Sequence, residues 1–166
     1  YFPGTGHNLR DPFLSRWQAF GGEPVLGQPL SEERYDPDYG LVQTFETMTL
    51  VYDPGLEYPW DIQGVLLDPA LVEDLAPASA RKSVNSCSEG TFFCQFFAET
   101  GHTISGGINS FWSLNGGLPA FGMPLSEPFK QKGISTQVFE RAALEDHSND
   151  KIQVVQLAAK QVEAGD

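Results

Sequence analysis

Residues 17–32 read Trp-Gln-Ala-Phe-Gly-Gly-Glu-Pro-Val-Leu-Gly-Gln-Pro-Leu-Ser-Glu, and residues 112–127 read Trp-Ser-Leu-Asn-Gly-Gly-Leu-Pro-Ala-Phe-Gly-Met-Pro-Leu-Ser-Glu. The two stretches match at a fixed separation of 95 positions, and fourteen identities at that separation extend back to Phe2 and Phe97. Four more follow at a separation of 94, ending at Leu50 and Leu144. A short duplicated unit usually buries its apolar face against a copy of itself, which favours a scaffold or recognition module over an enzyme.

Each copy predicts a short helix, a tight turn and a β-hairpin. Aromatic residues at helical spacing mark one face of the segment 13–20, and the Gly-Gly pair ends that helix. The Gly-x-Pro-Leu-Ser-Glu string predicts the turn. Residues 43–45 then alternate between faces as in a half-buried strand, with a hairpin partner over 49–52. We expect the repeated residues to form a structural core: Trp17, Phe45, Trp112, Phe139, His7 and His102.

The copies divide the chain into a first repeat at 1–75, a connecting segment at 76–96 and a second repeat at 97–166. An apolar stripe at helical spacing (Ile152, Val155, Ala159 and Val162) predicts a C-terminal helix over 151–164, packed either on the domain or on a neighbouring chain. The expected fold is therefore α+β, with two tandem repeats packed in pseudo-twofold symmetry and braced by this helix.

Composition limits the classes of partner. The 166 residues are 40% hydrophobic and 19% charged, which suits one packed domain or two small ones. A formal net charge of −12 argues against binding nucleic acid or anionic lipid. No apolar run reaches the length of a membrane span, so we expect no membrane insertion. The chain begins at Tyr1 rather than Met, which indicates a processed form or a fragment.

The only two cysteines, Cys87 and Cys94, enclose the string Ser-Glu-Gly-Thr-Phe-Phe. The glycine permits a turn that brings them together, and a disulfide there would indicate an oxidising, extracellular or cell-surface location. The alternatives are two unrelated reduced thiols or a metal site. Two thiolates without a nearby Cys or His do not fill a tetrahedral shell, so the disulfide is favoured and no metal is expected there.

The repeated titratable residues admit two interpretations. His7 and His102 could be ligands or acid–base groups, and the paired carboxylates Glu32/Glu127 and Glu46/Glu140 could support glycoside hydrolysis. No Asp, Cys or Ser repeats at a distance that would complete a triad or a metal set. We therefore favour hydrogen bonds that fix the chain, and expect no catalytic residues and no cofactor.

An acidic turn offers a weak calcium candidate. Asp36 and Asp38 match the front half of a calcium loop, and 146–150 forms a second acidic cluster. The twelfth position counted from Asp36 is Thr47, where a helix-loop-helix calcium site needs a bidentate Glu. A solvated turn is the favoured interpretation.

Aromatic residues divide into repeated and unrepeated ones. Repeated tryptophans at helical positions indicate core rather than a carbohydrate-stacking surface. Trp60 and the neighbouring Tyr58 lie in Glu-Tyr-Pro-Trp-Asp, outside the matched positions and flanked by polar residues. These two are the better candidates for a surface contact.

The spacing Trp-x3-Gly-Gly-x4-Gly-x-Pro, followed by Gln-x-Phe-Glu, resembles the LGFP-type repeat. The first copy carries Leu-Gly-Gln-Pro at 26–29, and the second carries Phe-Gly-Met-Pro at 121–124. The longer string is similar to repeats in secreted and surface proteins of Chloroflexi-type bacteria, and covers about 2–67 and 97–157. The resemblance implies an extracellular, non-catalytic module attached to wall or surface proteins. Phe at the Leu position and the cysteine pair depart from the pattern, so no ligand-binding residue is carried over.

Three functions follow as expectations. The favoured one is a non-catalytic, secreted or cell-surface module that binds envelope polysaccharide or a protein partner. The second is a structural subunit that polymerises into a filament, tube or sheath through open heterologous contacts. The third, and least favoured, is a hydrolase that uses the duplicated carboxylates or histidines.

Overall fold

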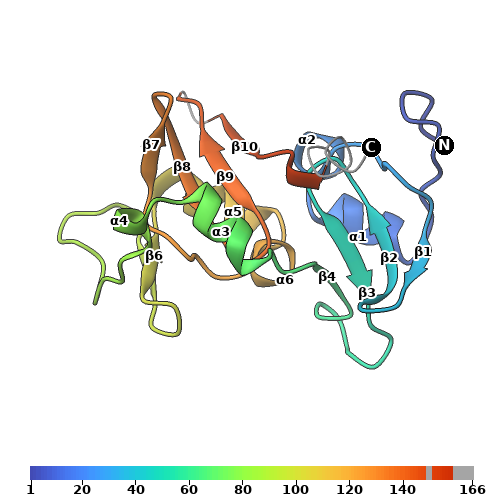
Figure 1. The fold of residues 1–166 in the computed structure, drawn as a ribbon, viewed down its shortest axis with the longest axis horizontal. Helices are drawn as coiled ribbons and strands as arrows, with labels where there is room; N and C mark the ends of the chain where they lie inside the picture. Colours follow the sequence, from blue (N-terminus) through green and yellow to red (C-terminus); the bar gives the residue numbers. More distant parts are fainter. Residues whose placement is uncertain (149–150, 159–166) are drawn as a thin grey trace. The chain divides into compact units, whose positions relative to one another are not determined.

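The computed structural model describes residues 1–148 and 151–158, and its helices and antiparallel sheets confirm the predicted α+β class (Figure 1). The chain forms two compact units. Unit 1 comprises residues 1–65 with the described residues 156–158, and unit 2 comprises residues 66–155. In the part of the chain that the structure describes, no helix combines the length and apolar character that a membrane crossing requires.

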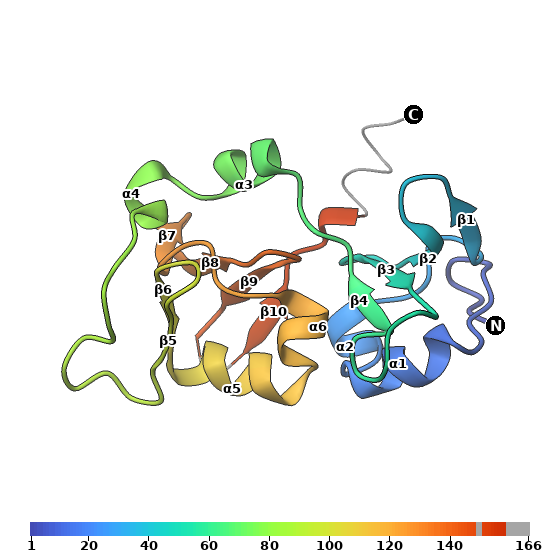
Figure 2. The same ribbon diagram turned by 90° about the horizontal axis from the view of Figure 1, so that it is seen from below.

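Unit 1 is a four-stranded antiparallel sheet with two short helices. The helices are α1 (Phe13–Ala19) and α2 (Glu23–Leu26). The strands β1 (Arg34–Asp36), β2 (Gly40–Thr44), β3 (Thr49–Tyr52) and β4 (Ile62–Gly64) lie in the order β1-β2-β3-β4. Figure 2 shows both helices on one side of this sheet.

Unit 2 contains elements in the same order, after an added N-terminal part that comprises α3 (Pro69–Leu75) and α4 (Ala78–Arg81). The paired strands β5 (Gln95–Phe97) and β6 (His102–Ile104) come next, and their Phe97–His102 pair corresponds to the isolated bridge between Phe2 and His7 in unit 1. Helices α5 (Gly106–Leu114) and α6 (Gly117–Phe121) follow. The second sheet has the order β10-β9-β8-β7, from β7 (Phe129–Gln131), β8 (Ile134–Val138), β9 (Ala143–Asp146) and β10 (Ile152–Val154). Figure 2 places α5 and α6 on one side of this sheet and α3 on the other.

The repeated aromatic residues pack inside their own units. Phe45 and Phe139 are fully buried, and Trp112 is buried whereas Trp17 is half-buried. The indole N–H of Trp17 donates to the carbonyl of Gly27 at 2.9 Å. In unit 2 the indole of Trp112 donates to Gly122 at the same distance. Each tryptophan thereby joins its first helix to the Gly-x-Pro turn.

The Gly-x-Pro turn is closed from the other side by a glutamate of the sheet. Gly122 has φ +77°, and a Cβ there would lie 2.6 Å from the Cβ of Glu140. The Glu140 carboxylate accepts the backbone N–H of Met123 at 2.7 Å. In unit 1, Gly27 has φ +75° and also lies against a glutamate, Glu46. Only glycine combines this backbone conformation with so close an approach.

The predicted C-terminal helix over 151–164 is wrong at its start, although Leu157 and Ala158 are helical. Ile152–Val154 form β10, which pairs antiparallel with β9 from Leu144 to Asp146. The apolar Ile152 and Val154 also fit the two-residue period of a strand, and pairing with β9 satisfies their backbone groups. Residues 159–164 of the predicted helix, including Ala159 and Val162, lie outside the described residues.

Substituting Gly122 with alanine tests the close approach at the turn. We expect Gly122→Ala to lower the free energy of unfolding by about 3 kcal/mol, because a left-handed backbone cost adds to a clash with Glu140. Gly133 is the matched control, since it has φ +80° and a Cβ added there would meet nothing within 4 Å. Gly133→Ala should cost about 1 kcal/mol, from the backbone alone. Urea unfolding measures both, and equal losses would contradict this account of the turn.

Candidate functional site

The repeated histidines and the Ser-Glu carboxylates come together within each unit. In unit 1 the Glu32 carboxylate accepts the backbone N–H of Asn8 at 3.0 Å, and His7 Nδ1 lies 3.6 Å from it. In unit 2 Glu127 accepts the backbone N–H and the hydroxyl of Thr103, at 2.9 Å and 2.6 Å. Each carboxylate thus fixes the segment that leads into the helix carrying the repeated tryptophan, α1 in unit 1 and α5 in unit 2.

A repeated glutamine ties the same segment to the sheet. Gln43 Nε2 donates to the carbonyls of Asn8 and Ser31, at 2.8 Å and 2.9 Å. Gln137 Nε2 donates to Thr103 and Ser126, at 2.7 Å and 2.8 Å. Both glutamines are buried. A buried side-chain amide that donates to two carbonyls stabilises the backbone. Both of its N–H groups are then used and cannot donate to a substrate.

The two carboxylate clusters differ in their exposure to solvent. The side chain of Glu32 is 53% exposed, and that of Glu127 is 25% exposed. The backbone N–H of Asn8, followed by its side-chain amide and His7, holds the pKa of Glu32 below its usual value. His102 is buried, with Nδ1 3.2 Å from Glu127. The unit 2 cluster is therefore the more enclosed of the two.

The calcium candidate is a hydrogen-bonded turn. Asp36 accepts the backbone N–H groups of Asp38 and Tyr39, and its other oxygen accepts from Arg34. These donors, led by the Asp38 N–H, lower the pKa of Asp36. Over 1–148 and 151–158, no three His, Cys, Asp or Glu side chains are grouped so that they could hold a metal ion.

The surface candidates Tyr58 and Trp60 lie in the loop between β3 and β4, which a buried arginine holds. Arg16 donates to the carbonyls of Pro59 and Ile62 and to the Asp61 carboxylate. Its guanidinium also lies 4.7 Å from the ring centre of Tyr58. Tyr58 is mostly exposed and Trp60 partly exposed. The Tyr58 ring thus covers Arg16 on one side and faces solvent on the other.

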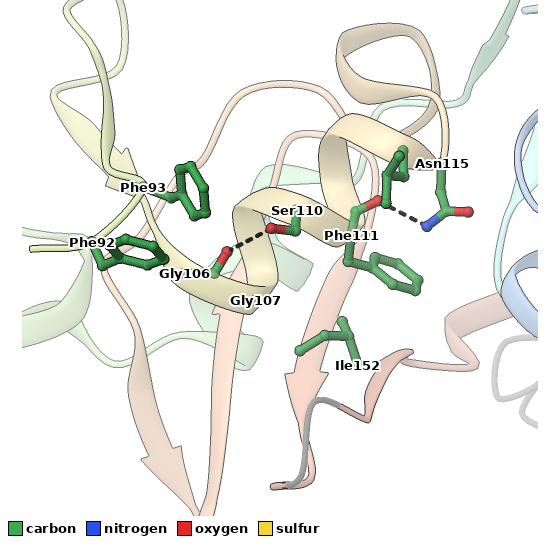
Figure 3. A pocket seen from close by; sticks show the side chains of 9 residues that line it. Phe92, Phe93, Gly106, Gly107, Ser110, Phe111, Asn115 and Ile152 are labelled. Atoms are coloured by element: carbon green, nitrogen blue, oxygen red, sulfur yellow. Dashed lines mark hydrogen bonds between the residues drawn. The ribbon is translucent and has the colours of Figure 1, made fainter.

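Two hollows in the surface were not predicted from the sequence. The first, here called the phenylalanine hollow, lies in unit 2 and measures about 480 Å³ (Figure 3). Its apolar lining comes from the cysteine-enclosed loop, α5 and β10, namely Phe92, Phe93, Phe111, Leu114 and Ile152. Among the described residues that line it, none is charged.

The loop between Cys87 and Cys94 carries Phe92 and Phe93 and leaves their rings exposed to solvent. Cys87 and Cys94 lie at disulfide-bonding distance, as expected from the sequence. The Phe92 carbonyl accepts the Gly106 N–H at 3.0 Å, and the Phe93 carbonyl accepts the Asn109 side chain at 2.8 Å. Phe92 is nevertheless 74% exposed. The loop is therefore attached to α5 through its backbone, while its aromatic rings remain uncovered.

The second hollow, here called the tyrosine hollow, lies in unit 1 and measures about 670 Å³. It is lined from all four strands of the sheet, the β1–β2 turn and the loop after β3, chiefly by Tyr35, Tyr39, Leu41, Tyr52, Asp38, Asp53 and Gln63. Apart from Ser110, which matches Ser15, the residues that line both hollows do not repeat between the units. The sequence feature that could have predicted the hollows is therefore the set of positions at which the copies differ. These are the Phe-Phe pair between the cysteines and the tyrosines around 35–52.

Removing the carboxylate of each cluster tests its structural role. Glu127→Ala should lower the free energy of unfolding by about 2 kcal/mol, because two donors of Thr103 and the buried His102 lose their partner. Glu32→Ala is the matched variant and should have a smaller effect, since solvent reaches that cluster. Chemical denaturation of both variants measures the difference. A larger loss for Glu32→Ala would contradict the assignment.

No family model matches this chain, and no curated protein matches it. The features of this chain that bear on its function are the internal hydrogen bonds of its repeated residues and the two hollows described above.

Proposed function

We propose that the protein is a non-catalytic binding module of the cell surface or extracellular space, built from two copies of one duplicated unit. The support comes from how the repeated polar side chains are used. Glu32 and Glu127 accept backbone N–H groups, and so do Glu46 and Glu140. Side chains engaged in this way hold the backbone, and we therefore propose none of them as a catalytic group.

The proposal of duplication rests on equivalent contacts in addition to sequence. Both sheets are four-stranded and antiparallel, and both Trp–Gly hydrogen bonds measure 2.9 Å. Phe2 meets Trp17 edge to face at 5.7 Å, and Phe97 meets Trp112 in the same way at 5.7 Å. The pseudo-twofold packing of the units and the membership of an LGFP-like family stay predictions.

The proposed location outside the cell rests on the cysteine pair. A bridge between Cys87 and Cys94 persists only in an oxidising compartment in most organisms. The bridge would also restrain the loop that carries Phe92 and Phe93. A structural bridge next to exposed aromatic rings suits a binding loop that must keep its shape.

The single observation that carries a binding function is the phenylalanine hollow. Exposed, contiguous apolar residues usually mark an interaction surface. On a chain of net charge −12, a hollow without charged lining residues lets an apolar segment approach without burying a carboxylate. We propose an envelope protein as the partner, which inserts apolar side chains between Phe92, Phe93 and Leu114.

Retention by isolated cell envelopes of the organism of origin tests this function. Phe92→Ser should reduce the protease-sensitive bound fraction of the chain by about tenfold, because an aromatic contact that binding buries is lost. Tyr1→Ser is the matched control, since Tyr1 is similarly exposed but lies outside both hollows. Treating the envelopes with protease should abolish the part of the binding that depends on Phe92, whereas periodate oxidation of glycans should leave that part intact. A Phe92-dependent bound fraction that survives protease would contradict the proposal.

Self-assembly into a filament or sheath is the second candidate function. The observation that favours it is that one chain carries two unlike exposed hollows, and a heterologous contact between unlike surfaces can propagate. Because the net charge of −12 opposes association of copies, salt should promote it by screening. Sedimentation velocity at rising protein and salt concentration should show polymers that Phe92→Ser abolishes. A single monomer boundary at high salt would remove this candidate.

A further inference from the structure

The tyrosine hollow contains a row of side chains set by strand register. Tyr35 of β1 is paired with Leu41 of β2, and Leu41 is paired with Tyr52 of β3. Directly opposed residues on antiparallel strands project from the same face of a sheet. Adjacent strands lie about 4.8 Å apart. The register therefore places two tyrosine side chains on one face with a leucine between them.

A comparison with unit 2 shows that the fold does not require this row. The equivalent register in the second sheet pairs Lys130 with Ser135 and Ser135 with Asp146. The same antiparallel sheet thus forms with polar side chains in place of Tyr35, Leu41 and Tyr52. Tyr35 is 76% exposed, so its ring contributes little to packing. An exposed aromatic ring that the architecture does not need indicates recognition.

Carboxylates border the tyrosine row. Asp38 lies in the turn after β1, and Asp53 directly follows β3. One oxygen of Asp53 accepts the Gly55 N–H at 2.8 Å, which orients this carboxylate. Tyr39, from the same turn as Asp38, adds a third phenol to the lining. The hollow therefore combines aromatic faces with hydrogen-bond acceptors, the mixture typical of small-ligand sites of about 300–1,000 Å³.

We propose that the tyrosine hollow binds a neutral oligosaccharide. The C–H faces of a pyranose ring can stack on tyrosine rings, whose faces carry partial negative charge. Sugar hydroxyls can donate to the exposed carboxylates of Asp38 and Asp53. Anionic glycans and nucleic acids would bring like charge against these carboxylates. A purely apolar segment would bury them without partners.

This site is separate from the proposed protein-docking function, because it uses different residues in a different unit. Binding of a saccharide at Tyr35 can therefore succeed or fail independently of docking at Phe92. A module with both sites would hold glycan through unit 1 and an envelope protein through unit 2.

Isothermal titration of the full chain with cellohexaose and chitohexaose tests the inference. We expect saturable binding of at least one of these neutral probes and none of oligogalacturonate, which is anionic. Tyr35→Ala should weaken the affinity by about tenfold, as loss of one stacked ring would. Tyr1→Ala is the matched control, with a ring as exposed as that of Tyr35 but outside the hollow, and should bind like the parent chain.

A second pair of variants separates the two proposed sites. Asp53→Asn should weaken saccharide binding while Phe92→Ser leaves it unchanged, with circular dichroism and melting temperature confirming that each variant is folded. Failure of both neutral probes to bind would overturn the inference. So would preferential binding of oligogalacturonate, or an equal loss of affinity in Tyr35→Ala and Tyr1→Ala. None of these results would bear on envelope retention through Phe92.

Discussion

The hydrogen bond from a tryptophan indole to a glycine carbonyl is the contact on which each unit depends. It joins the first helix to the Gly-x-Pro turn, from Trp17 to Gly27 and from Trp112 to Gly122. The turn is closed on its other side by a glutamate, which lies so close to the glycine that no larger residue fits. Helix, turn and sheet are thereby held together at one point in each unit.

The side chains that the two units share form hydrogen bonds to the backbone. We therefore look for function at the positions where the units carry different residues. Unit 1 has tyrosines across its sheet where unit 2 has Lys130 and Asp146. Unit 2 has Phe111 where unit 1 has Arg16, and Phe111 lines the phenylalanine hollow whereas Arg16 is buried against Asp61. One architecture thus presents two surfaces of different chemistry. We propose that the two surfaces take different partners.

The sequence predicted the features of secondary structure that depend on the spacing of residues within a short segment. Helical spacing of aromatic residues, glycine pairs and alternating strands anticipated the α+β class, and the hairpin expected between 43–45 and 49–52 is the pair β2 and β3. The segment from Ile152 was misassigned because its apolar residues fit helical and strand periods alike, and only the partner strand β9 decides between them. The hollows were missed for a related reason. Phe92 and Ile152 line one hollow, and Tyr35 and Tyr52 line the other, through register and loop packing that no single window of sequence contains.

Hydrogen exchange of the three indole N–H protons, followed by nuclear magnetic resonance, tests the central claim most directly. Trp17 and Trp112 donate to glycine carbonyls, while Trp60 is partly exposed in a loop and serves as the internal reference. The account predicts slow exchange for the indole protons of Trp17 and Trp112 and fast exchange for that of Trp60. Exchange at Trp17 and Trp112 as fast as at Trp60 would contradict it.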